Sequence, residues 1–249
     1  MIELSSIDST NNYALSLLKG PNLTERQENV GHGSAVFAHE QFAGKGQRGK
    51  TWLSHSGENV HLSVIINPEK IGLQRQFLLI AIIALAVRDF FDHYAQSDIS
   101  IKWPNDIYFK ERKAGGILIE NVISGKEWKW AVAGIGLNIN QIDFQKVKER
   151  IPVSLKQITG KSFDCFELAK ELRNEIMNRY EYVMMSQSVD AIIEEYNHYL
   201  FKKNEKVYFE KEGKTFEALV KEVLPTGQLI VQTDVEMNFD FGEVKWLKR

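Results

Sequence analysis

The sequence has little cysteine and little proline. Its 249 residues include one cysteine and five prolines, so no internal disulfide can form. A chain of this length buries enough apolar surface to fold without a disulfide or a structural metal. A single cysteine suits a reducing compartment, and the N-terminal residues lack the basic and apolar regions of an export signal. We therefore expect a cytoplasmic protein.

Long hydrophobic runs are also missing. The longest extends from Phe77 to Val87 and is followed by Arg88 and Asp89, whereas a helix that spans a bilayer needs about 20 apolar residues. We interpret this run as a buried helix of the core and expect no membrane partner.

The charges of the chain nearly cancel. Lysine and arginine number 31 against 33 for aspartate and glutamate, which gives a formal net charge of −2. Proteins that mainly bind the nucleic-acid backbone usually carry a basic excess. The charge balance therefore argues against DNA as a partner and leaves room only for a local basic patch.

The order of the predicted elements indicates an α+β fold. Apolar runs predict strands, and apolar residues at helical spacing predict helices. Strands are predicted at residues 35–38, 61–67, 99–103, 107–109, 116–122 and 128–135, and helices just after residue 8 and at 73–94, 164–183 and 188–200. Short strands at 206–209, 216–223, 229–232 and 244–247 are typical of a small barrel. We predict a larger domain at 1–200 and a small β-barrel at 201–249.

A glycine-rich loop follows the first predicted buried strand. Residues 44–49 read Gly-Lys-Gly-Gln-Arg-Gly, which fits the G-x-G-x-x-G pattern of dinucleotide-binding folds. That pattern needs a helix directly after the loop, whose N-terminus binds pyrophosphate. Here the next regular element is a predicted strand, which argues against a Rossmann site. Three cations (Lys45, Arg48 and Lys50) make the loop either an anion-binding loop or a solvated basic turn.

A second cluster reads Lys-Trp-Pro-Asn-Asp at residues 102–106. Lys102 lies between Ile101 and Trp103 in a predicted strand, so we expect it to be partly buried. A partly buried ammonium needs an anionic partner or a stem that reaches water. The alternative is a strand-end lysine before an ordinary turn. Glycines at 115–116, 134 and 136 indicate either close approach of a ligand or close packing.

Taken together and in order, these segments resemble biotin protein ligases, which attach biotin to a lysine of carrier proteins. The matching stretches are residues 8–11, 40–52, 102–106, 112–120 and 134–138. The resemblance implies a mixed-sheet biotin/lipoate ligase-like catalytic domain, which binds biotin and ATP, with a C-terminal SH3-like β-barrel. It also implies ATP-dependent biotinylation of a biotin carboxyl carrier protein through biotinyl-5′-AMP, with release of pyrophosphate and then AMP.

The resemblance implies roles for individual residues. Catalytic roles fall to Lys102, Arg48 and Lys50. The biotin-binding residues would be Ser9, Thr10, Asn11, Gln41, Lys45, Gly46, Gln47, Trp52 and Lys102, and the nucleotide-binding residues Lys45, Arg48, Lys50, Lys113 and Asn138. Asp106 is a candidate for the carboxylate that organises Mg²⁺ and the phosphates. The chemistry explains the cations, because a carboxylate must approach a polyphosphate of like charge.

Two departures from the family pattern have consequences. Gln47 stands where arginine is common, so we expect retention of the adenylate to depend more on Arg48 and Lys50. The Ser-Thr-Asn motif begins at residue 9, which leaves no room before it for the DNA-binding segment of some members. We therefore expect a ligase without a repressor role. Related enzymes form homodimers by sheet extension, so the resemblance adds a second copy of the chain as a candidate partner.

Three other functions are weighed against this one. A lipoate protein ligase shares the fold and the acyl-adenylate chemistry, and the tryptophans and Pro104 of the two signatures favour biotin. A non-catalytic sensor is less favoured, because Lys102 and the basic loop are both retained. A metallohydrolase is excluded, because the six histidines show no paired-ligand spacing.

Overall fold

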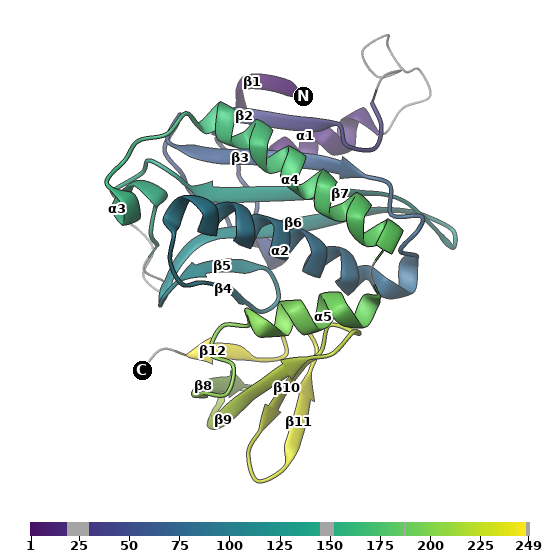
Figure 1. Cartoon of the computed structure of the whole chain (residues 1–249), viewed down its shortest axis with the longest axis vertical. Helices are drawn as coiled ribbons and strands as arrows, with labels where there is room; N and C mark the ends of the chain where they lie inside the picture. Colours follow the sequence, from purple (N-terminus) through teal and green to yellow (C-terminus); the bar gives the residue numbers. More distant parts are fainter. Residues whose placement is uncertain (19–29, 145–151, 187, 248–249) are drawn as a thin grey trace.

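The computed structural model describes residues 1–18, 30–144, 152–186 and 188–247. Two sheets organise these residues, a large one with helices on both faces and a smaller one at the C-terminal end (Figure 1). Within the described residues, no helix is both long enough and apolar enough to cross a membrane.

The larger sheet has seven strands in the order β1-β2-β3-β7-β6-β5-β4. Their bounds are β1 Ile2–Ile7, β2 Ala35–Gln41, β3 Asn59–Ile66, β4 Ile99–Lys102, β5 Asp106–Phe109, β6 Arg112–Ser124 and β7 Glu127–Asn138. Strands β1 and β2 are parallel, and every other neighbouring pair is antiparallel. The predicted mixed sheet is therefore confirmed. Strand β1 was not predicted, because its residues are at most partly buried and its pairing is long-range.

The helices cover the two faces of this sheet unequally. Their bounds are α1 Thr10–Leu17, α2 Gln76–Ala95, α3 Leu155–Thr159, α4 Cys165–Ser186 and α5 Val189–His198, with 3₁₀ turns η1 Gln47–Gly49 and η2 Leu73–Arg75. Helices α2 and α4 lie across one face, and α1 lies on the other (Figure 1). The small α1 leaves part of its face uncovered by helix.

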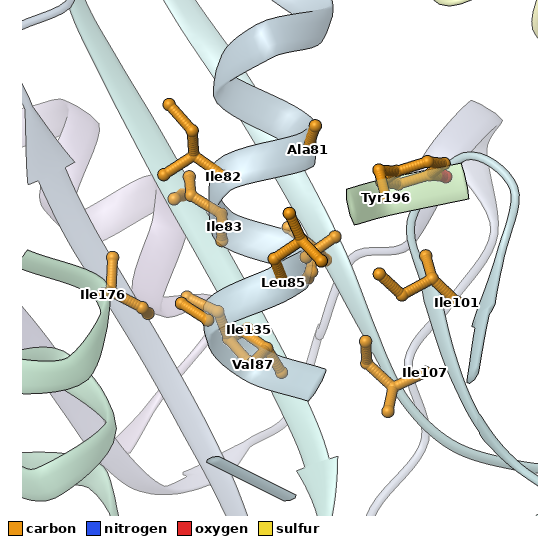
Figure 2. Packing of buried hydrophobic residues seen from close by; sticks show 14 of the residues in the cluster. Ala81, Ile82, Ile83, Leu85, Val87, Ile101, Ile107, Ile135, Ile176 and Tyr196 are labelled. Atoms are coloured by element: carbon orange, nitrogen blue, oxygen red, sulfur yellow. The ribbon is translucent and has the colours of Figure 1, made fainter. Parts of the chain in front are cut away.

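Helix α2 is the centre of the main core. It is buried almost all round, as its unbroken apolar run predicts. Figure 2 shows Ile82, Leu85 and Val87 of α2 among apolar side chains that include Ile135 of β7 and Ile176 of α4. The helix begins at Gln76, a few residues after the predicted start, because residues 73–75 form the 3₁₀ turn η2.

The smaller sheet is antiparallel, with the order β11-β10-β9-β8-β12. Its strands are β8 Lys206–Lys211, β9 Lys214–Val223, β10 Leu229–Gln232, β11 Glu236–Phe239 and β12 Lys245–Leu247. The predicted C-terminal strands are all present. Strand β11 was not predicted, because only Phe239 of its four residues is buried. We call β8–β12 the C-terminal sheet; the predicted domain boundary after residue 200 stays a prediction.

Asn197 at the end of α5 fixes the C-terminal sheet to the rest of the molecule. Its amide nitrogen donates to Val223 O at 2.8 Å, and its amide oxygen accepts from Val223 N at 2.7 Å. Asn197 is buried, so both backbone groups of Val223 depend on this side chain. The pair sets where β9 ends against α5.

His61 of β3 holds the chain that follows the glycine-rich loop. Its Nδ1 lies 3.1 Å from Ala38 O, and its Nε2 lies 2.8 Å from Ser54 Oγ. A carbonyl oxygen only accepts, so Nδ1 carries the proton and Nε2 accepts from the Ser54 hydroxyl. Burial lowers the pKa of His61, which keeps the ring neutral, and the hydrogen bond to Ala38 opposes this only in part.

Replacing Asn197 with alanine should destabilise the protein. The Asn197→Ala variant leaves Val223 N–H and C=O buried without partners, at a cost of about 2 kcal/mol or more. Urea unfolding followed by tryptophan fluorescence measures the loss. Asn238→Ala, at an exposed asparagine of β11, should change the free energy of unfolding by less than about 0.5 kcal/mol. Equal losses in the two variants would contradict the assigned role.

Acid should weaken the fold through His61. A histidine whose pKa is lower in the folded state stabilises the protein above the unfolded pKa of about 6.5, and this contribution is lost as pH falls through the folded pKa. We expect His61→Gln to reduce the slope of unfolding free energy against pH below about 6.5. Burial also lowers the pKa of His32, so part of the pH dependence should remain in the His61→Gln variant. The exposed His198→Gln variant is the control, and identical slopes in both variants would refute the assignment.

Candidate active site

A cavity of about 820 Å³ opens where the glycine-rich loop, the uncovered sheet face and the C-terminal sheet meet. Side chains alternate between the two faces of a strand. Ile117 of β6 and Ile135 of β7 belong to the main core, so their neighbours in the two strands point to the other face of the sheet. Those neighbours include Gly116, Gly134 and Gly136, which line the cavity.

The glycines of β6 and β7 let two side chains lie against the sheet. A Cβ on Gly134 would lie 2.3 Å from Asn11 Oδ1, and one on Gly136 would lie 2.7 Å from Trp52 Cε2. Neither position tolerates a side chain without displacing its neighbour. These glycines are therefore close-packing sites that seat Asn11 and Trp52 at the cavity.

One end of the cavity is a buried polar network at the start of α1. Gln41 Oε1 accepts from Thr10 N at 2.8 Å and from Thr10 Oγ1 at 3.1 Å. Ser63 Oγ lies 2.8 Å from Thr10 Oγ1 and 2.6 Å from Asn11 Oδ1. Asn11 Nδ2 donates to Glu120 Oε2 at 2.8 Å. The network fixes the orientation of both amide side chains.

Ser9 is the N-cap residue of α1, yet its side chain makes no cap hydrogen bond within the part of the chain that is described. The residue is 2% exposed and lines the cavity. A serine at this position usually caps the helix. Its hydroxyl is therefore placed at the cavity without serving the helix end.

The glycine-rich loop closes on itself as a tight hairpin. Gly46 N donates to Lys50 O at 2.6 Å, and Trp52 N donates to Gly44 O at 2.9 Å. The next element after η1 is strand β3, which confirms the prediction that a strand, and no helix, follows the loop. Lys45 Nζ lies 3.5 Å from Glu120 Oε1, which connects the loop to the polar network.

Arg48 of the loop binds the C-terminal sheet. Its guanidinium donates to Gly242 O at 2.8 Å and to Phe241 O at 2.6 Å, and it lies 5.0 Å from the centre of the Phe241 ring. Arg48 has a φ of 56°, a left-handed conformation that L-residues seldom adopt. The two charge-assisted hydrogen bonds help to offset this backbone cost.

Lys102 lies at the end of β4 and is partly buried, as predicted. Its ammonium lies 5.1 Å from the Tyr108 ring, 5.6 Å from the Phe201 ring and 5.2 Å from the Trp246 ring. Cation–π attraction to several rings stabilises a charge that has lost part of its water. Trp246 belongs to β12, so the surroundings of Lys102 are built from both sheets.

The turn after Lys102 is held on three sides. Asn105 N donates to Lys102 O at 3.1 Å, and Trp103 Nε1 donates to Gly227 O at 2.9 Å. Tyr196 OH donates to Pro104 O at 2.9 Å. Burial, and then the charge of Asp106, raise the pKa of Tyr196 well above its usual value, so the phenol remains a neutral donor.

Lys113 and Asp106 form an ion pair at the cavity wall. Lys113 Nζ lies 2.6 Å from Asp106 Oδ1 and 5.7 Å from the Trp52 ring. Asn138 Nδ2 donates to Lys113 O at 3.3 Å and to Val153 O at 3.2 Å. Asn138 therefore supports the backbone that carries Lys113. The roles of these residues toward a nucleotide stay predictions.

Mg²⁺ binding is tested against the donors present. Among residues 1–18, 30–144, 152–186 and 188–247, no group of three or more histidine, cysteine, aspartate or glutamate side chains could hold a metal ion. Mg²⁺ at phosphate sites commonly takes one or two carboxylates and completes its shell with phosphate oxygens and water. Asp106 fits such a site as a single carboxylate, and that role stays a prediction.

The structure gathers every predicted site residue around this one cavity. They are Ser9, Thr10, Asn11, Gln41, Lys45, Gly46, Gln47, Arg48, Lys50, Trp52, Lys102, Asp106, Lys113 and Asn138. Sequence reasoning missed Ser63 and Glu120 of the polar network, although Glu120 lies in a stretch matching the family. It also missed the part of the wall made by Glu210, Phe241, Gly242, Glu243, Val244, Lys245 and Trp246.

Curated relatives of this chain are similar to it in sequence. Bifunctional ligase/repressor BirA of Bacillus subtilis (strain 168) is 36% identical over 138 residues, which cover 55% of this chain and 42% of that protein. A biotin–[acetyl-CoA-carboxylase] ligase of Paracoccus denitrificans is 34% identical over 167 residues and is covered to 65%. The chain thus spans less than half the length of the first curated relatives it matches.

Solved structures show the same fold. Biotin protein ligase from Aquifex aeolicus, in complex with biotin and ATP, superposes with a TM-score of 0.80 at 24% identity and covers 100% of this chain and 98% of that one. Both sheets are therefore common to the two proteins, which agrees with the expected SH3-like C-terminal domain. The sequence profile of the Biotin/lipoate A/B protein ligase family matches residues 4–138. Because this match covers more than half of the 249 residues, the chain belongs to the biotin/lipoate A/B protein ligase family.

Proposed function

We propose that this protein is an ATP-dependent biotin protein ligase that forms biotinyl-5′-AMP and transfers the biotinyl group to a lysine of a biotin carboxyl carrier protein. The observation that carries the proposal is the cavity itself, which joins a buried polar end to a wall of cations. Relatives named as biotin ligases and a ligand-bound neighbour of the same fold support it.

The polar end suits the ureido group of biotin. That group has two N–H donors and one carbonyl acceptor, and the network offers Ser9, Thr10 and Gln41 side chains with both donor and acceptor atoms. Trp52 and the glycine face of β6 and β7 supply an apolar wall beside it. The dithiolane ring of lipoate has no N–H or carbonyl group to satisfy such a network, which favours biotin over the alternative, a lipoate protein ligase.

The cations suit the first half-reaction. A biotin carboxylate oxygen attacks the α-phosphorus of MgATP, a new oxygen–phosphorus bond forms, and the bond to pyrophosphate breaks. Two unit charges about 4 Å apart repel by about 1 kcal/mol in water and several times more at lower dielectric. We assign Lys102 to the carboxylate and α-phosphate, and Lys45, Lys50 and Lys113 to the phosphates, with Asn138 beside the nucleotide. Arg48, whose guanidinium donates to Phe241 O and Gly242 O, would act through the position of the loop.

The second half-reaction needs no residue to become covalently modified. The amine of the carrier lysine attacks the carbonyl carbon of biotinyl-5′-AMP, the amide bond forms as the bond from that carbon to the phosphate oxygen breaks, and AMP and a proton are released. Mg²⁺ would enter as part of MgATP, and we assign Asp106 as the carboxylate that would lie beside it. A closed cavity protects the mixed anhydride from water.

Other expectations from the sequence stay predictions. They concern the absence of a DNA partner and of a repressor role, a cytoplasmic location, and homodimerisation by sheet extension. In the larger sheet β1 and β4 are the outer strands, so sheet extension would use one of these edges.

The proposed reaction is tested by the mass of a carrier domain. Incubation with MgATP and biotin should add one biotinyl group to the carrier lysine, and lipoate should add nothing. Lys102→Ala should lower the rate about 100-fold or more, because charge stabilisation in the transition state is lost. Lys221→Ala, at an exposed lysine of β9, should leave the rate unchanged. No mass shift with biotin would contradict the proposal, and a shift with lipoate alone would show that the protein is a lipoate protein ligase.

A second experiment compares the contribution of a loop cation to adenylate formation with that of Gln47. Both Gln47 and Lys50 line the cavity, but only Lys50 carries a charge for the phosphates. We expect Lys50→Ala to lower the rate of adenylate formation about tenfold or more and Gln47→Ala to lower it less. Pyrophosphate release measures this step alone. Loss of the step in Gln47→Ala, with Lys50→Ala intact, would show that the two roles are assigned the wrong way round.

A further inference from the structure

The glycine-rich loop and the C-terminal sheet meet at one contact. The Arg48 guanidinium reaches the turn between β11 and β12 and donates to the carbonyl oxygens of Phe241 and Gly242. Arginine suits such a contact, because its planar fork presents parallel N–H donors. Both acceptors are backbone atoms, so the contact depends on the path of the turn more than on its side chains.

Gly242 is fitted to the guanidinium. A Cβ at this position would lie 1.5 Å from Arg48 Cζ, and the residue has a φ of +86°. Any side chain there would occupy the space of the guanidinium, and an L-residue would strain the turn as well. The turn can therefore bind the Arg48 guanidinium only while residue 242 has no side chain.

The same turn contacts the other half of the cavity. The Phe241 ring lies edge-on to Trp103, with ring centres 5.8 Å apart, and Trp103 follows Lys102 directly. Trp103 also donates to Gly227 O of the C-terminal sheet. The residues around Lys102 and the glycine-rich loop are thus both positioned against turns that connect the strands of the C-terminal sheet.

We propose that Arg48 is a positioning residue that ties the glycine-rich loop to the turn containing Phe241 and Gly242, so that the C-terminal sheet holds the loop over the cavity and slows the escape of the adenylate. This inference rests on the proposed ligase function for its consequence, but the contact itself is independent of it. Lys45 and Lys50 then face the bound phosphates from a loop whose position Arg48 sets.

The contact is tested first by amide hydrogen exchange in the full chain without substrates. Gly242→Ala and Arg48→Ala should each speed exchange of residues 44–52 by about tenfold or more, because the hydrogen bonds to a charged group are lost. Gly213→Ala is the matched control, since Gly213 lies in the β8–β9 turn with a φ of +76°, and a Cβ added there would meet nothing within 4 Å. It carries the same backbone strain without the contact. Unchanged exchange of 44–52 in both test variants would overturn the proposal.

The consequence is tested by release of preformed biotinyl-5′-AMP. We expect release about tenfold faster in Arg48→Ala and in Gly242→Ala, and no further acceleration in the double variant, because both changes remove one contact. Additive effects, or equal acceleration in Gly213→Ala, would refute it. If Gly242→Ala does not fold, Arg48→Ala with Arg48→Lys keeps the test decisive, since lysine cannot donate in parallel to both carbonyls. A wild-type protein that makes no adenylate would defeat the proposed function, while the exchange measurement would still decide the contact.

Discussion

The alternation of side chains along β6 and β7 is the constraint on which the site depends. One face of these strands must carry large apolar residues such as Ile117 and Ile135, because α2 packs on it. The other face carries glycines at the positions where Asn11 and Trp52 approach the sheet. A register shift of a single residue would exchange the two faces and destroy both the core and the cavity. Fold stability and the shape of the site are therefore set by the same pairing.

The charge distribution follows from the need to hold cations together before any anion arrives. Lys45 lies near Glu120, Lys113 pairs with Asp106, and Lys102 is surrounded by aromatic rings. Each arrangement moderates the repulsion among the ammonium groups at modest desolvation cost, because the two ion pairs remain partly exposed. An incoming phosphate can exchange with these partners. This explains how a chain with a net charge of −2 can present a basic cavity.

Much of the site could be predicted from the sequence, because its signals are local. The glycine-rich loop with no helix directly after it, the partly buried Lys102 in a strand and the buried run of α2 each follow from neighbouring residues, and the structure confirms all three. Long-range pairing was beyond reach. Strand β1 has a weak apolar pattern and is defined by its partner β2, and Ser63 of β3 enters the network only because β3 lies beside Gly134 of β7. Pairings between distant segments leave no mark on the segment itself.

The contribution of the C-terminal sheet was hidden for a different reason. Besides Lys102, which lies against the Trp246 ring, Trp103 and Arg48 contact this sheet by donating to the backbone carbonyl oxygens of Gly227, Phe241 and Gly242. Every residue has such an acceptor, so these hydrogen bonds require a particular backbone path and a small residue at 242, and the Phe241 ring is the side chain that adds to them. A sheet that recognises its neighbour through main-chain atoms can change most of its surface without losing the contact. Its sequence therefore carries little sign of a role in the site, even though the cavity is incomplete without it.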